Sequence, residues 1–174
     1  MAIAKKKKDI KISFVDSPSS EDVTGSLIFI STPNHKILVD AGLYQTNDKY
    51  QDFLVNNRKY KEFKPKEIDY IFITHCHGDH CLLIPKLFKE GCKAKVILTA
   101  ESAAVLKDMA LDCAEINQRD VLVINTQNNK SYSPLYIEED VEKMMCNIDV
   151  QSVNEKVIID NTLSYELIPA GHLL

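Results

Sequence analysis

Three histidines and an aspartate lie within six positions of one another, and they are the residues of this chain best suited to chemistry. They are His75, His77, Asp79 and His80, and they follow the apolar residues 71–74. Imidazole and carboxylate groups are the ligands that a borderline ion such as Zn²⁺ selects. Alternate residues of an extended chain project to the same side, so His75 and His77 can share one metal. Asp79 and His80 lie a turn further on and can reach a second metal.

The alternative is a polar loop that is rich in histidine without binding a metal. The whole chain has five histidines, and three of them fall in this short run. That concentration favours a metal site over a histidine-rich loop that arose by chance.

The same run resembles the signature of a known family. The pattern His-x-His-x-Asp-His at residues 75–80 is similar to that of the metallo-β-lactamase superfamily. Residues 23–26 and 37–45 are similar to the opening of its β-CASP branch. That branch includes ribonuclease J and the endonuclease of eukaryotic mRNA 3′-end processing.

Two later segments agree with this resemblance and occur in the expected order. Residues 134–136 and 138–141 resemble a segment of the bacterial RNA-processing members. Residues 169–174, Pro-Ala-Gly-His-Leu-Leu, look like the next metal-ligand motif of the same branch. The resemblance therefore covers the chain from about Ile12 to its end.

The resemblance implies a role for each residue of the site. His75, His77 and His172 would bind the first metal, and Asp79 and His80 would bind the second. Three histidines and a water form a zinc site of the catalytic type, with one open position. In the complete family site the zinc-activated hydroxide attacks phosphorus. Asp79 would also orient or deprotonate the water, so Asp79 and His80 are the catalytic candidates.

Asp40 and His172 have simpler alternative interpretations. In the family, the aspartate at the position of Asp40 supports the metal loops by hydrogen bonds and does not bind metal. The alternative is a plain turn-forming aspartate. A lone histidine near a chain end is usually unremarkable, but the Pro-Ala-Gly-His context of His172 favours a ligand.

The family fold implied here is α/β, a four-layer αββα sandwich, and this chain would supply mainly its first half. We expect a basic tail at residues 1–9, followed by the N-terminal part of the domain at residues 10–174. The β-CASP insert and the last ligand motifs would lie beyond it, in a larger protein, a split gene product or a truncated reading frame. The sheet would then expose an apolar face, open to self-association or to a missing C-terminal segment.

Composition narrows the class of protein. The chain has 174 residues, is 45% hydrophobic and carries a net charge of −4, which fits one globular domain. No apolar run is long enough to span a membrane, and no secretory signal is recognisable. Five cysteines without a Cys-x-x-Cys pair indicate neither a disulfide framework nor a zinc finger, and they predict a cytoplasmic location. Cys76 and Cys81, which flank the histidine run, are expected to be buried or half-buried thiols. The lysine run at residues 5–8 is typical of a solvated tail, with contact to RNA phosphates as the alternative.

Strands that alternate with helices predict an α/β fold with a sheet covered by helices. We expect Phe53 and Leu54 on the buried side of the first helix, and one buried stripe on the third helix, formed by Val105, Met109, Cys113 and Ile116. The strands are expected at residues 10–15, 25–30, 36–39, 68–74, 95–98 and 121–124. The helices are expected at residues 48–61, 81–90, 101–116 and 138–146, a loop at 125–133, and a final hairpin at 156–159 and 163–168.

Three hypotheses for function follow. The first is hydrolysis of RNA by a metal-dependent ribonuclease of β-CASP type, with two Zn²⁺ in the complete enzyme and one in this chain. The second is a truncated, non-catalytic metal-binding fragment or association module. The third is a hydrolase of another ester or thioester on the same fold. The segments outside the histidine run favour RNA.

Overall fold

The computed structural model describes residues 9–15 and 24–172. Nearly all of the predicted basic tail, and Val23 of the quoted motifs, lie outside the described residues. The same holds for the last two residues of the Pro-Ala-Gly-His-Leu-Leu motif.

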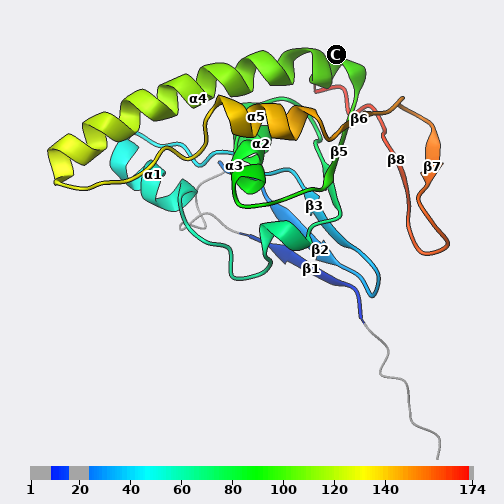
Figure 1. The fold of residues 1–174 in the computed structure, drawn as a ribbon. Coiled ribbons are helices and arrows are strands. Elements are labelled where there is room, and N and C mark those ends of the chain that lie inside the picture. Colours follow the sequence, from blue (N-terminus) through cyan, green and yellow to red (C-terminus); the bar gives the residue numbers. More distant parts are fainter. Residues whose placement is uncertain (1–8, 16–23, 173–174) are drawn as a thin grey trace, which may run out of the picture.

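Six strands form one mixed sheet, in the order β1-β2-β3-β4-β5-β6 (Figure 1). The first three pair in antiparallel fashion, and β3 to β6 run parallel. A separate antiparallel hairpin, β7–β8, follows. The strands are β1 (Lys11–Phe14), β2 (Ile28–Ser31), β3 (Lys36–Val39), β4 (Tyr70–Phe72), β5 (Lys95–Leu98), β6 (Ile148–Val150), β7 (Lys156–Ile158) and β8 (Ser164–Glu166).

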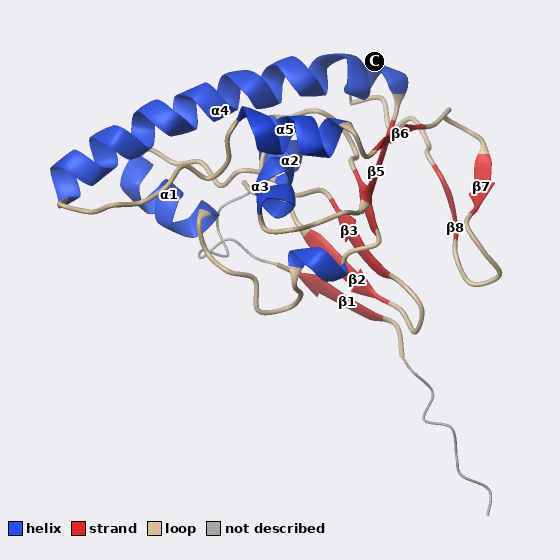
Figure 2. Cartoon of the chain, in the orientation of Figure 1, coloured by secondary structure: helices blue, strands red, loops and turns tan. Residues whose placement is uncertain are grey.

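Helices cover one face of this sheet, and the β7–β8 hairpin lies on its other side (Figure 2). On the helix side, Leu38, Ile71 and Val96 come from neighbouring strands and have no exposed surface. They form the centre of the core with the buried faces of α3, α4 and α5. The helices are α1 (Lys49–Asn56), α2 (Gly78–Cys81), α3 (Ile84–Lys89), α4 (Ala100–Asn128) and α5 (Glu138–Met145). The predicted α/β class is confirmed.

The face away from the helices is only partly covered. Tyr165 of β8 contacts Phe72 of β4, with ring centroids 4.8 Å apart. At the β1 end, Ile12 and Phe14 keep 57% and 69% of their surface exposed. The expected apolar face is therefore open beside β1 and closed by the hairpin beside β4.

The longest helix corrects two predictions. α4 runs unbroken to Asn128, so the extended piece at 121–124 is wrong, as is the start of the loop at 125–133. Val121 and Ile124 are buried, while the two residues between them are exposed. Two buried residues three positions apart fit a helix. The run of apolar residues looked strand-like because periodicity is ambiguous over so short a stretch.

The buried stripe of α4 lies one residue later than predicted. Val105 and Ile116 are 46% and 44% exposed, and Met109 and Cys113 pack only partly against the core. The fully buried positions on this stretch are Leu106, Ala110 and Ala114. Alanine lets a helix backbone approach its neighbours closely, so small residues form the contact here and larger ones border it.

Smaller differences concern the other helices. The helix predicted at 81–90 is two helices, α2 and α3, because Pro85 at the start of α3 has no N–H for a continuous ladder. α3 ends at Lys89, and Gly91 follows two residues later with φ +92°, a conformation that suits a residue just beyond a helix. α1 is shorter than predicted, and Leu54 is 36% exposed while Phe53 is buried. Consecutive residues of a helix point about 100° apart, and Leu54 lies on the side of α1 that turns away from the core.

Two strands also differ from expectation. β4 is shorter than the run 68–74, and Phe72 is only half-buried because the face away from the helices is partly open. β6 was not predicted, because Asp149 interrupts its apolar pattern. The terminal hairpin is confirmed. Among the described residues, no helix is both long and apolar enough to cross a membrane.

Candidate metal centre

The end of β3 brings Asp40 against the histidine loop. Asp40 has φ +60°, a left-handed conformation that Asp and Asn adopt more readily than most residues. Its side chain is 4% exposed. One carboxylate oxygen accepts a hydrogen bond from the Thr74 backbone N–H at 2.8 Å. The other lies 2.8 Å from both the Thr74 hydroxyl and His80 Nδ1. A buried carboxylate with three donors fixes both ends of the loop.

Backbone hydrogen bonds hold the same loop from a second side. Ala41 N donates to His80 O at 2.8 Å, and Leu43 N donates to Gly78 O at 3.0 Å. Between them, a Cβ placed on Gly42 would lie 1.6 Å from Asp79 O. Only glycine permits this approach of two backbones. We call residues 74–80 the metal loop and residues 40–43 its backbone clamp.

His75, His77 and His172 meet although His172 comes from the far end of the chain. One ligand nitrogen from each lies within 4.8 Å of the others. The ring centroid of His172 lies 4.9 Å from that of His75 and 5.2 Å from that of His77. A tetrahedral zinc ion with Zn–N bonds of about 2.0–2.1 Å places its nitrogens roughly 3.3 Å apart. The three side chains fit such an ion after small ring movements.

Hydrogen bonds define which nitrogen of His75 is free. The Thr74 hydroxyl donates to Asp40, so it accepts from His75 Nδ1, which lies 3.0 Å away. His75 Nε2 therefore keeps its lone pair and lies 3.0 Å from His77 Nδ1. Burial, followed by repulsion from His80 and His77, lowers the pKa of His75. A neutral imidazole with one committed N–H is the form that binds metal.

Asp79 and His80 do not belong to this three-histidine group. His80 commits Nδ1 to Asp40 and so leaves Nε2 free, 3.7 Å from Asp79 Oδ2. Both side chains are partly exposed. They offer two ligand atoms beside the histidine group, and their binding of a second metal stays a prediction.

The thiols in and beside the metal loop are structural. Cys76 and Cys81 are buried, as predicted. Cys76 Sγ donates to Ser102 O at 3.2 Å, which ties the loop to the first turn of α4. The hydrogen bond with Cys76 and burial raise the pKa of Cys81, so it stays a neutral thiol.

From the sequence, Tyr44, Tyr132 and Tyr136 could each stack on a base or pack in the interior, and the structure shows packing. Tyr136 has no exposed surface and Tyr44 is buried. Tyr132 lies partly buried beside Phe53, with ring centroids 5.1 Å apart. Packing was the favoured interpretation for all three residues.

His35, in the turn that follows β2, is partly buried. Its side chain is 12% exposed, and Nε2 lies 2.7 Å from Asp160 Oδ2. The pattern of the turn at residues 32–35 gave no sign of this contact, because Asp160 lies far away in the sequence.

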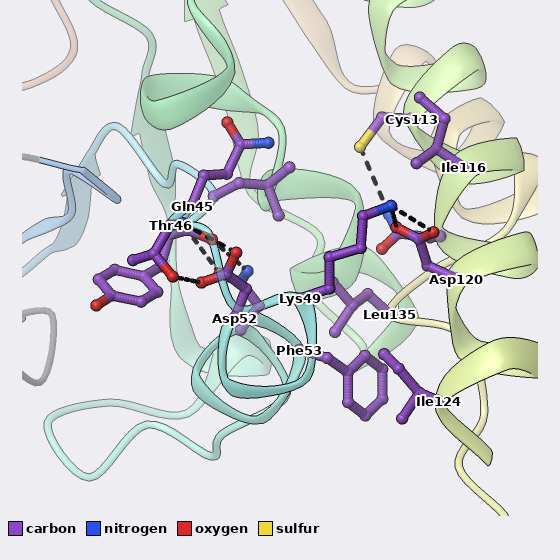
Figure 3. A pocket seen from close by; sticks show the side chains of 14 residues that line it. Gln45, Thr46, Lys49, Asp52, Phe53, Cys113, Ile116, Asp120, Ile124 and Leu135 are labelled. Atoms are coloured by element: carbon purple, nitrogen blue, oxygen red, sulfur yellow. Dashed lines mark hydrogen bonds and ion pairs between the residues drawn. The ribbon is translucent and has the colours of Figure 1, made fainter. Parts of the chain in front are cut away.

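A hollow of about 390 Å³ lies between α1 and α4, away from the histidines (Figure 3). Lys49 bridges it by an ion pair with Asp120 at 3.0 Å. None of the residues lining it is a metal-ligand candidate. It touches the backbone clamp only at Leu43, so the histidine group forms a separate site.

Comparison with known proteins identifies the family. The description "Metallo-beta-lactamase superfamily" matches residues 21–143. This chain belongs to the metallo-beta-lactamase superfamily.

Three relatives have names from RNA processing and transcription. "Ribonuclease TTHA0252" of Thermus thermophilus is 28% identical over 89% of this chain and 31% of its own length. "Transcription termination factor FttA" of Methanocaldococcus jannaschii is 26% identical over 95% of this chain and 24% of its own length. "Cleavage and polyadenylation specificity factor subunit 3-I" of Arabidopsis thaliana is 25% identical over 90% of this chain and 20% of its own length. The resemblance to the superfamily and its RNA-processing branch is confirmed. The chain spans less than a third of each relative.

The site contains one element that sequence reasoning missed. The Thr74 hydroxyl donates to Asp40 and accepts from His75 Nδ1, so it links the buried carboxylate to the first histidine. Thr74 directly precedes that histidine, but a hydroxyl group is too common to single out without the fold. The glycines in the motifs, Gly42 among them, indicated from the sequence that these loops converge, and the close approach at Gly42 agrees with that prediction.

Proposed function

We propose that this chain carries the first metal site of an RNA-cleaving metallohydrolase and that the metal is zinc. The observation that carries the proposal is the meeting of His75, His77 and His172 within 4.8 Å. Imidazole ligands suit zinc among the common cellular ions. The names of the relatives support RNA as the substrate.

His75, His77 and His172 would hold this ion. Zinc, when bound, lowers the pKa of water to about 7 and stabilises negative charge on phosphoryl oxygens. The Asp40–Thr74–His75 chain of hydrogen bonds keeps the His75 imidazole in one tautomer and orientation. His75 would thus be oriented before the metal binds.

Asp79 and His80 have the catalytic roles in this proposal. Asp79 is partly exposed beside the histidine group, so its carboxylate can accept a proton from water or orient it. His80 is held by Asp40 through Nδ1 and presents Nε2 outward. Together they would offer a second zinc ion two ligands.

The domain boundaries remain proposals as well. Residues 10–174 would be the N-terminal part of the family domain, preceded by a basic tail at 1–9. The short span relative to the relatives supports this division. The cytoplasmic location inferred from the sequence stays a prediction.

The second candidate function is a metal-binding module without catalysis. It is favoured by the Asp79–His80 pair, which supplies only two of the ligands a second metal needs. In that case the chain would bind one zinc and cleave nothing.

The test measures zinc per chain by elemental mass spectrometry, with cleavage of single-stranded RNA on the same samples. We expect about one zinc in the wild-type chain and its loss in His77→Ala. Glu115→Gln, which removes an exposed carboxylate on α4, is the matched control and keeps its zinc. RNA cleavage lost in Asp79→Asn while zinc is retained would support the hydrolase. Zinc without any RNA cleavage would favour the binding module, and no zinc would refute the site.

A further inference from the structure

The third histidine reaches the site in a different way from the other two. His172 lies five residues beyond Leu167, where the chain leaves β8. In the described part of the chain, no hydrogen bond anchors residues 168–172. The position of His172 therefore follows from the position of the β7–β8 hairpin.

Side chains join that hairpin to the six-stranded sheet. His35 Nε2 lies 2.7 Å from Asp160 Oδ2, and Asn34 Nδ2 donates to the Thr162 hydroxyl at 3.2 Å. Further along, the Tyr165 ring meets Phe72 edge-on. The first two contacts join the turn between β2 and β3 to the turn between β7 and β8, and the third joins β4 to β8.

The His35–Asp160 contact is built on both sides. His35 is 12% exposed and packs edge-on against Tyr70, with ring centroids 5.8 Å apart. Asp160 uses its other oxygen to accept from Thr162 N and from Leu163 N, which shapes its own turn. Each partner is held by its own turn before the two meet, so little side-chain freedom is lost on contact.

We propose that His35 is a positioning residue for the metal site: by holding Asp160 it docks the β7–β8 hairpin and so places His172 against His75 and His77. This inference rests on the proposed zinc site. His35 does not touch the metal position and acts entirely through the hairpin.

Substitution of His35 separates this role from general stability. The backbone of His35 accepts from Thr32 N and donates to the Thr32 hydroxyl. His35→Ala keeps both contacts and so leaves the turn intact. His35→Gln is the conservative variant, because a glutamine amide can still donate to Asp160.

The first measurement is zinc affinity by competition with a chromophoric chelator. We expect His35→Ala to weaken zinc binding about tenfold, in the range found for residues that support metal ligands. His35→Gln should restore most of the affinity. In a His172→Ala background, His35→Ala should cause no further loss, because the group it positions is gone. Equal losses in both backgrounds, or none in the wild-type background, would overturn the proposal.

The second measurement needs no metal. Amide hydrogen exchange of the metal-free chain should accelerate in His35→Ala at Asn154, whose N–H bonds to Leu167 O at 2.7 Å. Exchange at Ala41 and Leu43 in the backbone clamp should not change. An undocked two-stranded hairpin is marginal in water, which predicts this local loss. If the wild-type chain bound no zinc, the metal site would be refuted, while unchanged exchange at Asn154 would refute the docking role alone.

Discussion

The metal loop and the β7–β8 hairpin both carry ligands of the candidate metal site, but they are held in place by different kinds of contact. Backbone atoms hold the metal loop, with hydrogen bonds from Ala41 and Leu43 and the close approach at Gly42. The hairpin is held by side chains, chiefly His35 and Asp160. Backbone contacts, together with the buried Asp40 carboxylate, hold the loop that carries His75 and His77. The place of His172 depends on a few exchangeable side chains.

This difference teaches which part of the site is preformed. His75, whose tautomer is fixed by Thr74, and His77 lie on the metal loop, and the third ligand comes from a separate unit of structure. Local units of a protein open at different free energies. We therefore expect metal affinity to respond to hairpin substitutions that leave the six-stranded sheet unchanged.

The largest expected effect comes from Gly42→Ala. Its Cβ would clash with the Asp79 carbonyl, so the backbone clamp and the metal loop cannot both keep their positions. We expect a loss of about 3 kcal/mol or more in the free energy of unfolding, measured in urea.

Gly91→Ala is the matched control for this change. Gly91 has φ +92° and no atom near its would-be Cβ. Only backbone strain remains, worth about 1–2 kcal/mol. Equal losses in the two variants would mean that the close approach at Gly42 is unimportant, and the comparison would fail.

Asp40→Asn should have an intermediate effect. Asparagine accepts the same backbone conformation but carries no charge, and its amide hydrogens would face the donors of Thr74 or His80. We expect a loss of about 2 kcal/mol in unfolding free energy without metal, and weaker zinc binding. Glu115→Gln, in an exposed pair, should cost less than about 0.5 kcal/mol. A stable Asp40→Asn variant with full zinc affinity would contradict the role assigned to Asp40.

The smallest effect concerns the hairpin turn. Hydrogen bonds from Thr162, aided by His35, lower the pKa of Asp160 to about 2. Because the folded pKa lies below the ordinary aspartate value of 3.8, this stabilisation is complete above pH 3.8 and is lost as the pH falls through about 2. Thr162→Val removes the hydroxyl and also the contact with Asn34. The pKa of Asp160 should then rise towards 3.8, as an NMR titration of its carboxyl group would show. An unchanged pKa would mean that the Thr162 hydroxyl does not hold this turn.

The sequence predicted correctly the short elements that have clear boundaries, but not the features that depend on how elements pack against one another. The strands at Lys36–Val39 and Lys95–Leu98 agree to the residue, because each is a short apolar run between turns. The predicted buried stripe of α4 was wrong, because the helix contacts the core through alanines, which a hydrophobic pattern undervalues. Local pattern carries no information about how closely two elements approach.

For the site, spacing predicted the neighbours but not the distant contacts. His75 and His77 follow from their own positions in the sequence. That His172 meets them in space, and that His35 meets Asp160, depends on the path of the whole chain. The motif suggested the first of these contacts only through family resemblance.

The left-handed backbone at Asp40 also limits what a related sequence could carry there. Glycine, asparagine and aspartate adopt this conformation at low cost, and only aspartate brings a charge. A sequence with glycine or asparagine at this position could keep the turn and the fold. It would lose the anion that orients Thr74 and His80. This position therefore distinguishes chains that retain an organised metal loop from chains that retain only the architecture.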